Sequence, residues 1–113
     1  MTSHTCPPEA AAARWRLAAL ALLEQNLAED AVRALRHAVE LNPGDAGAWN
    51  DLGVVLEALG NRRDAVHCYR SALRCAPQMH EAWRNLLALA AQAAAQASLP
   101  PPARNRAAMA VAR

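Results

Sequence analysis

Three side chains of the kinds that bind metal ions lie close together in the sequence, namely His67, Cys68 and Cys75. A structural zinc site needs four such ligands, with neighbouring cysteines typically about two to four residues apart. The two cysteines are seven positions apart, and no further ligand completes a known pattern. We therefore predict no metal site and no cofactor.

The hydroxyl and imidazole groups do not form a catalytic pattern either. A serine nucleophile needs a base, a carboxylate and a tight turn that is usually rich in glycine. Ser71 has no flanking glycine, and His37 lies 34 positions before it, so we expect both on polar helix faces. The 4 glycines are not clustered, which excludes a phosphate-binding loop. We predict that the chain is not an enzyme.

The arginines form a pattern with chemical consequences of its own. Along residues 63–74 the basic side chains recur at helical spacing, and two more lie 34 positions before members of this series. The predicted convex basic ridge consists of Arg33, Arg36, Arg63, His67, Arg70 and Arg74. Such a ridge can contact phosphates, so RNA is a minor alternative partner. A net charge of only +2 and the expected lack of exposed aromatic residues between the arginines argue against nucleic acid.

A fixed interval of 34 residues shows which elements position these side chains. Trp15, Trp49 and Trp83 are spaced by this interval, as are Pro43 and Pro77. An internal period of this length indicates a repeated pair of helices. The composition agrees, because Ala, Leu, Arg and Glu favour helices and the aromatic residues typical of strands make up only 4%. We predict an all-α solenoid.

The second unit gives the helix boundaries most clearly. Gly60 and Asn61 separate its two helices, and Pro77 ends the second one, because the residue before a proline avoids helical dihedrals. In the first unit, Asn26 takes the left-handed position that Gly60 takes later. Asp45 has the residue type of an N-cap for the helix that carries Trp49.

The second unit resembles the tetratricopeptide repeat (TPR) family at eight signature positions, which are Trp49, Leu52, Gly53, Leu56, Ala65, Tyr69, Ala72 and Pro77. The first unit fits less well, with Ala18 and Ala19 in place of Leu and Gly. Small residues at three of the eight positions let two helices approach closely, and large ones fill the space between repeats. The predicted repeat-packing residues are Trp15, Trp49, Gly53, Ala65, Tyr69, Ala72, Pro77 and Trp83.

The fold class that follows is a right-handed TPR-like α-solenoid of two full repeats plus a long C-terminal capping helix. The last unit cannot be complete in the usual way, because three prolines follow Leu99 where a second helix would run. The predicted segments are an N-terminal arm at 1–9, a TPR domain at 10–98, made of repeats at about 12–45 and 46–79 with a half repeat at 80–98, and a Pro-rich, Arg/Ala-rich tail at 99–113.

The resemblance and the apolar final helix together suggest three functional possibilities. In TPR proteins the first helix of each pair lines a concave groove that accepts a peptide or protein segment. The groove candidates here are Arg16, Leu20, Asn50, Asp51, Val54, Glu57, Glu81, Arg84, Asn85 and Ala88. The apolar final helix, at about 79–97, also predicts a homodimer as an alternative. A third possibility is an accessory module of a larger enzyme, such as a bacterial glycosyltransferase.

The remaining composition bears on source and compartment. The chain has no Lys, Phe or Ile, whose codons are AT-rich, and we interpret this as the mark of a GC-rich bacterial genome. An odd number of cysteines favours free thiols, with Cys75 expected at an apolar core position. No stretch is long and apolar enough to span a membrane, and we expect a cytoplasmic protein.

Overall fold

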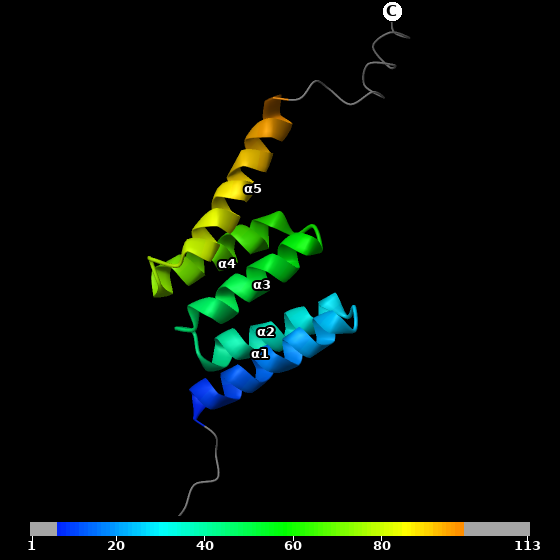
Figure 1. Ribbon diagram of the computed structural model, residues 1–113, viewed down its shortest axis with the longest axis vertical. Helices are drawn as coiled ribbons and strands as arrows, with labels where there is room; N and C mark the ends of the chain where they lie inside the picture. Colours follow the sequence, from blue (N-terminus) through cyan, green and yellow to red (C-terminus); the bar gives the residue numbers. More distant parts are fainter. Residues whose placement is uncertain (1–6, 99–113) are drawn as a thin grey trace, which may run out of the picture.

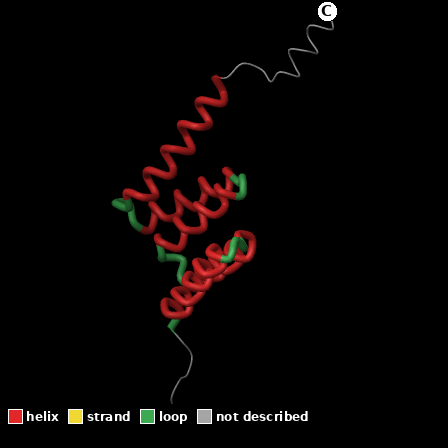
Figure 2. The backbone as a smooth tube through the Cα atoms, turned by 45° about the vertical axis from the view of Figure 1, so that its right-hand side comes forward, coloured by secondary structure: helices red, strands yellow, loops and turns green. Residues whose placement is uncertain are grey.

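The computed structural model describes residues 7–98, and this part contains five α-helices and no strand (Figures 1 and 2). The helices are α1 (Pro8–Glu24), α2 (Ala28–Leu41), α3 (Ala46–Ala58), α4 (Arg62–Cys75) and α5 (His80–Ser98). The first four form two hairpins, and α5 continues past the end of the second hairpin (Figure 1). The predicted all-α repeat architecture is confirmed, whereas the predicted tail at 99–113 lies outside the described residues.

The helix ends follow the residue types expected at them. The Asp45 carboxylate accepts a hydrogen bond from the Ala48 backbone N–H at 3.1 Å, which satisfies one of the free donors of the first turn of α3. The turns within the hairpins contain Asn26, with φ 64°, and Gly60, with φ 86°. Both are the left-handed conformations that the sequence predicted, and Asn and Gly adopt them at low cost.

Each hairpin is held by small side chains where its helices meet. A Cβ atom at position 53 would lie 2.6 Å from the Tyr69 ring, so only glycine lets α3 and α4 approach this closely. Ala65 and Ala72, also on α4, are fully buried. The large residues Leu35 and Tyr69 fill the interior, as the repeat pattern indicates.

The three tryptophans differ in their packing. Trp49 is half-buried and packs against the core, whereas Trp15 and Trp83 are exposed. The incomplete last repeat indicated the exposure of Trp83, but the sequence did not indicate that of Trp15. Trp15 stacks on His37 with their ring centroids 4.7 Å apart. The indole N–H of Trp49 donates to the Pro43 carbonyl oxygen at 2.8 Å. The Trp83 indole N–H donates to the Pro77 carbonyl oxygen at 2.7 Å. Trp49 and Trp83 therefore each bind the turn that precedes their helix, whereas Trp15 contacts His37 of α2.

Two expectations about burial were wrong. Ser71 is buried, and its hydroxyl donates to the His67 carbonyl oxygen at 2.9 Å, so its polar group is satisfied within its own helix. Cys75 is exposed, because it is the last residue of α4 and the chain turns away there. Its thiol contacts the Pro43 carbonyl oxygen at 3.3 Å.

Candidate functional site

One hollow lies between α1 and α3 and reaches the first turn of α5. It has a volume of about 150 Å³ and brings together four of the predicted groove residues, which are Leu20, Asp51, Val54 and Glu81. Its other lining residues are Ala19, Leu23, Leu35 and Val55. The exposed Leu20 and Val54 form its apolar rim, and two carboxylates add negative charge. The hollow suits an apolar side chain whose neighbours are basic.

Three other groove candidates link one repeat to the next. The Arg16 guanidinium donates to the Asp51 carboxylate at 2.7 Å and lies 3.8 Å from Asp45. The Asn85 amide donates to the Asn50 side-chain oxygen at 3.0 Å. Both bonds join residues 35 positions apart. The two hydrogen bonds therefore join the same pair of repeat positions in successive repeats. This relation was not predicted from the sequence.

These bonds correct the roles that the sequence predicted for two of the residues. Asn50 is 1% exposed and does not face the groove, because Asn85 of α5 covers its side-chain amide. Arg16 is half-buried over Gly47, where a Cβ atom would lie 2.5 Å from the guanidinium. Both side chains hold adjacent first helices together.

The last three groove candidates lie outside the hollow. Glu57 is half-buried and accepts a hydrogen bond from the Tyr69 hydroxyl at 2.8 Å. Burial raises the pKa of Tyr69, and the bond to Glu57 raises it further. Arg84 and Ala88 are exposed on α5, and neither lines the hollow.

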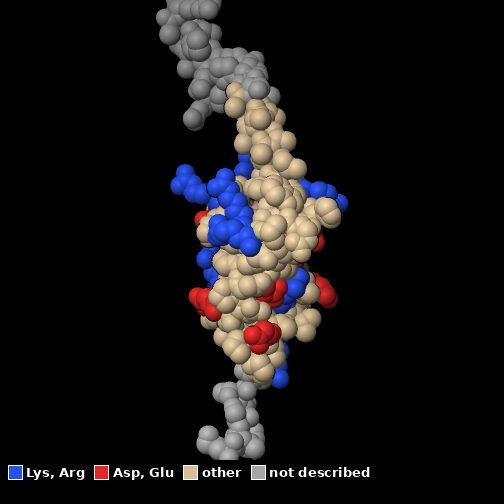
Figure 3. Space-filling view, turned by 90° about the vertical axis from the view of Figure 1, so that its left-hand side faces the viewer, with Lys and Arg blue, Asp and Glu red and all other residues tan. Residues whose placement is uncertain are grey.

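A second concave surface, the α4–α5 cleft, lies on the other side of α5. Its apolar floor comes from Val66 and Leu73 of α4 together with Trp83, Leu86, Leu89 and Ala93 of α5. Arg62, Arg63, Arg70 and Arg74 line it as well, and no carboxylate of the described residues does. Figure 3 shows arginines gathered at this end of the described chain and most of the carboxylates lower down.

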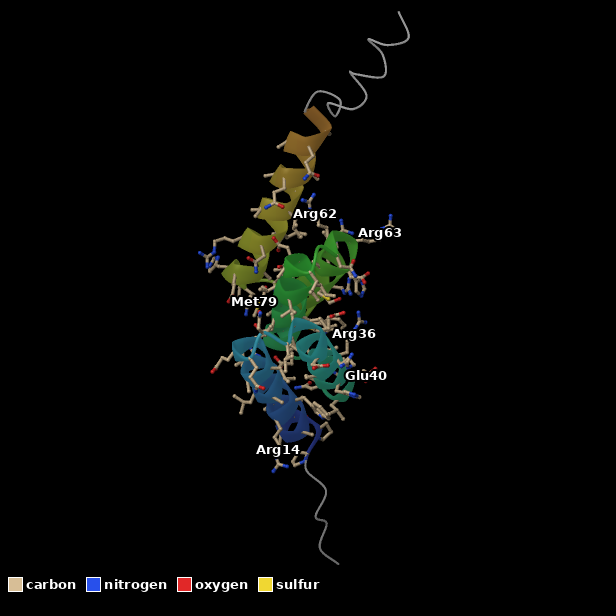
Figure 4. The ribbon with its side chains drawn as sticks, turned by 90° about the vertical axis from the view of Figure 1, so that its right-hand side faces the viewer. Arg14, Arg36, Glu40, Arg62, Arg63 and Met79 are labelled. Carbon is tan, nitrogen blue, oxygen red and sulfur yellow. The ribbon has the colours of Figure 1, made fainter. Side chains whose placement is uncertain are left out.

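The predicted basic ridge is divided between different surroundings. Arg63, His67, Arg70 and Arg74 line the α4–α5 cleft. Arg36 instead lies with Glu40 further along the molecule, away from Arg62 and Arg63 (Figure 4). Arg33 forms an ion pair with Asp30 on its own helix. The expectation that no exposed aromatic residue lies among the arginines was wrong, because Trp83 lies beside Arg70 and Arg74.

The thiols and imidazoles do not form a metal centre in the described part of the chain, where no group of three His, Cys, Asp or Glu side chains is placed to hold an ion. Cys68 is buried, and burial raises its pKa to about 11. It is therefore a neutral thiol near pH 7 and a poor nucleophile.

These features define a class of protein, a helical-repeat scaffold whose paired helices present surfaces along the stack. The family description "tetratricopeptide repeat" matches residues 22–90, which is more than half of the chain. The chain therefore belongs to the tetratricopeptide repeat family. Repeats of this kind are typically non-catalytic and generally mediate protein–protein interaction.

Curated relatives resemble the chain over part of their length. A tetratricopeptide repeat-containing protein of Caenorhabditis elegans, trd-1, is 34% identical over 67 residues. Protein FlbA of Caulobacter vibrioides is 36% identical over 67 residues. Each match covers 59% of this chain but only 9% of trd-1 and 11% of FlbA. The chain thus spans a small part of either relative.

Solved structures support the fold. MamA superposes with a TM-score of 0.68 at 23% identity, over 70% of this chain and 46% of MamA. A tetratricopeptide repeat domain protein of Salinibacter ruber gives a TM-score of 0.63 at 24% identity, over 70% of this chain and 93% of that protein. Within residues 7–98 no helix combines the length and apolar character needed to cross a bilayer.

Proposed function

We propose that the chain is a non-catalytic interaction module of the bacterial cytoplasm that binds a peptide or protein segment in the groove formed by α1, α3 and α5. The observation that supports this most strongly is the hollow between α1 and α3. Four side chains chosen from their repeat positions, Leu20, Asp51, Val54 and Glu81, line this one small depression. Ligand sites of this kind are concave and mostly apolar with a few polar groups.

The charges of the hollow indicate what kind of segment it accepts. The Asp51 carboxylate is already bonded to Arg16, whereas Glu81 is exposed and has no ion pair within residues 7–98. A ligand with an apolar side chain in the hollow and a Lys or Arg beside it would pair with Glu81. The proposed ligand is therefore a segment with an apolar anchor and a basic neighbour.

A peptide library displayed on phage and selected on the full chain tests this proposal. We expect enrichment of sequences with an apolar residue next to Lys or Arg. A synthetic peptide of the enriched sequence should bind the wild type and lose most of its affinity for Val54→Glu, which places a charge on the apolar rim. Arg14→Glu, an exposed change on α1 outside the hollow, is the matched control.

Two results would contradict the proposal. The first is a selection that enriches no common sequence. The second is a selected peptide that binds Val54→Glu as well as it binds the wild type while circular dichroism shows the variant to be folded. Either result would show that the hollow does not bind such a segment. Neither result would change the family or the repeat architecture.

A further inference from the structure

The α4–α5 cleft lies where the repeat plan places a helix. In the second repeat, α4 packs against α3, the first helix of its own unit. Residues of α2, α3 and α4 line one depression there, and they include Arg36, Val39, Trp49 and Leu52. Adding 34 to each number gives Arg70, Leu73, Trp83 and Leu86, which all line the α4–α5 cleft. The cleft is therefore the equivalent place one repeat later.

Exposure shows that no helix of residues 7–98 fills the equivalent place. Leu52 is 2% exposed, whereas Leu86 is half-buried. Leu56 is buried, whereas the equivalent Ala90 is exposed. Leu86 thus has the repeat position of a core residue without the covering helix that buries Leu52 in the second unit, whereas Leu89 of the same floor is already buried.

The charges at equivalent positions have opposite signs. The α4–α5 cleft has Arg62, Arg63, Arg70 and Arg74, four positive charges. The positions 34 residues earlier hold Ala28, Glu29, Arg36 and Glu40, with a net charge of 1 − 2 = −1. The residues of α4 that line this earlier place are Asp64, His67 and Cys68, whereas its four arginines line the α4–α5 cleft. The cleft therefore differs from the earlier place by an unbalanced positive charge.

From this unbalanced positive charge beside an apolar floor we propose that the α4–α5 cleft binds an amphipathic helix of a partner protein whose apolar stripe is flanked by Asp and Glu. The apolar floor takes the stripe, and the four arginines pair with the carboxylates. Arg70 and Arg74 lie beside both the Val66–Leu89 part of the floor and the Trp83–Leu86 part. Arg62 donates to the Gln96 amide oxygen at 2.7 Å, which ties the start of α4 to the end of α5.

Two other occupants have the wrong charge. Residues 99–113 contain three arginines and no acidic residue. A second copy that paired through the same cleft would place four arginines against four arginines. Like charges across an interface are unfavourable, so neither occupant matches the cleft as an acidic helix does.

The test uses three fluorescein-labelled, helix-stapled peptides and the full chain in anisotropy titrations. The first peptide is a designed helix with a stripe of leucines that is flanked by glutamates. The second has arginines in place of the glutamates, and the third has the glutamates of the first but serines at its apolar positions. We expect the first to bind at least about tenfold more tightly than either of the others and to weaken as salt is raised.

The protein variants locate the binding. Arg70→Glu/Arg74→Glu should lower the affinity for the acidic amphipathic peptide about tenfold or more. Arg14→Glu/Arg33→Glu makes the same change in net charge on α1 and α2 and should leave the affinity unchanged. Val54→Glu should also leave it unchanged, so this result is independent of the hollow between α1 and α3.

Four outcomes would overturn the proposal. The acidic peptide could bind no better than the basic one, or the serine peptide could bind as well as the apolar one. An oligouridine RNA could bind more tightly than any of the peptides. Sedimentation could also show a dimer that Arg70→Glu/Arg74→Glu dissociates, which would assign the cleft to a second copy.

Discussion

Helices α3 and α5 occupy equivalent places in successive repeats, but their surroundings differ. Both have in their first turn a fully buried alanine followed by a tryptophan, at Ala48–Trp49 and Ala82–Trp83. Helix α3 is enclosed by α4 on one side and has α1 and α5 as neighbouring first helices. Helix α5 contacts α4 and α3, and its far end extends past them (Figure 1).

The difference shows that a repeat position specifies a packing role only when the neighbouring helix is present. Leu52 and Leu86 have the same repeat position, but Leu52 is buried in the core and Leu86 is only half-buried. Where the neighbour is absent from residues 7–98, the core pattern becomes an apolar surface. Surfaces of this kind commonly mark interaction sites.

The largest expected effect comes from truncating the two equivalent leucines. Leu52→Ala should lower the free energy of unfolding by about 2–5 kcal/mol, because it leaves a cavity between α3 and α4. Leu86→Ala should cost less than half as much, since this side chain already contacts solvent. Urea denaturation of both variants measures the difference. Equal losses would mean that position 86 is as fully enclosed as position 52.

Positions 53 and 87 form a second matched pair. Gly53→Ala places a Cβ atom against the Tyr69 ring and should destabilise the protein by about 1–3 kcal/mol through overpacking. Leu87→Ala should change the stability by less than about 0.5 kcal/mol, because Leu87 is 62% exposed. Thermal and urea unfolding measure both changes. A stabilising Gly53→Ala would contradict the close approach of α3 and α4.

The two links between repeats should differ in strength. Asn85→Ala leaves the buried Asn50 amide oxygen without its donor and should cost about 1–3 kcal/mol. Arg16→Ala removes a partly exposed ion pair and should cost about 0.2–1 kcal/mol. Urea unfolding of both variants decides the order. A greater loss in Arg16→Ala would mean that the charged link is the stronger one.

The smallest expected effect is a pH dependence caused by the buried thiol of Cys68. Burial raises the pKa of Cys68 from 9.0 to about 11, so the folded state favours the neutral thiol. The resulting stability is complete below pH 9 and is lost as the pH rises through about 11, with a slope below about 1.4 kcal/mol per pH unit. Cys68→Ala should flatten the decline in urea titrations under reducing conditions.

Much of the fold could be predicted because repetition supplies independent evidence for each element. The turns at Asn26 and Gly60 and the cap at Asp45 follow from residue type and position. The burial of Asn50 could not be derived from its own position, because Arg16 and Arg84 hold the equivalent places. The signal that could have revealed it is the 35-residue interval that joins Arg16 to Asp51 and Asn50 to Asn85.

The binding surfaces were harder to predict from the sequence than the helices were. Helical spacing placed Arg70 and Arg74 on one face, but it did not show that Val66, Leu73 and Leu89 form an apolar floor beside them. That arrangement depends on how α5 lies against α4. The burial of Ser71 also depends on tertiary packing. Its hydroxyl is hydrogen-bonded within its own helix, so it needs no partner on another helix.

Hydrogen exchange measured by mass spectrometry on the full chain tests the open α4–α5 cleft most directly. Amide protons of α3 (Ala46–Ala58) should exchange slowly, because they open only when the packed hairpins unfold. Those of residues 91–97 near the end of α5, where the side chains are exposed, should exchange much faster. Equally slow exchange in both segments would show that the cleft is covered in solution and would contradict the account.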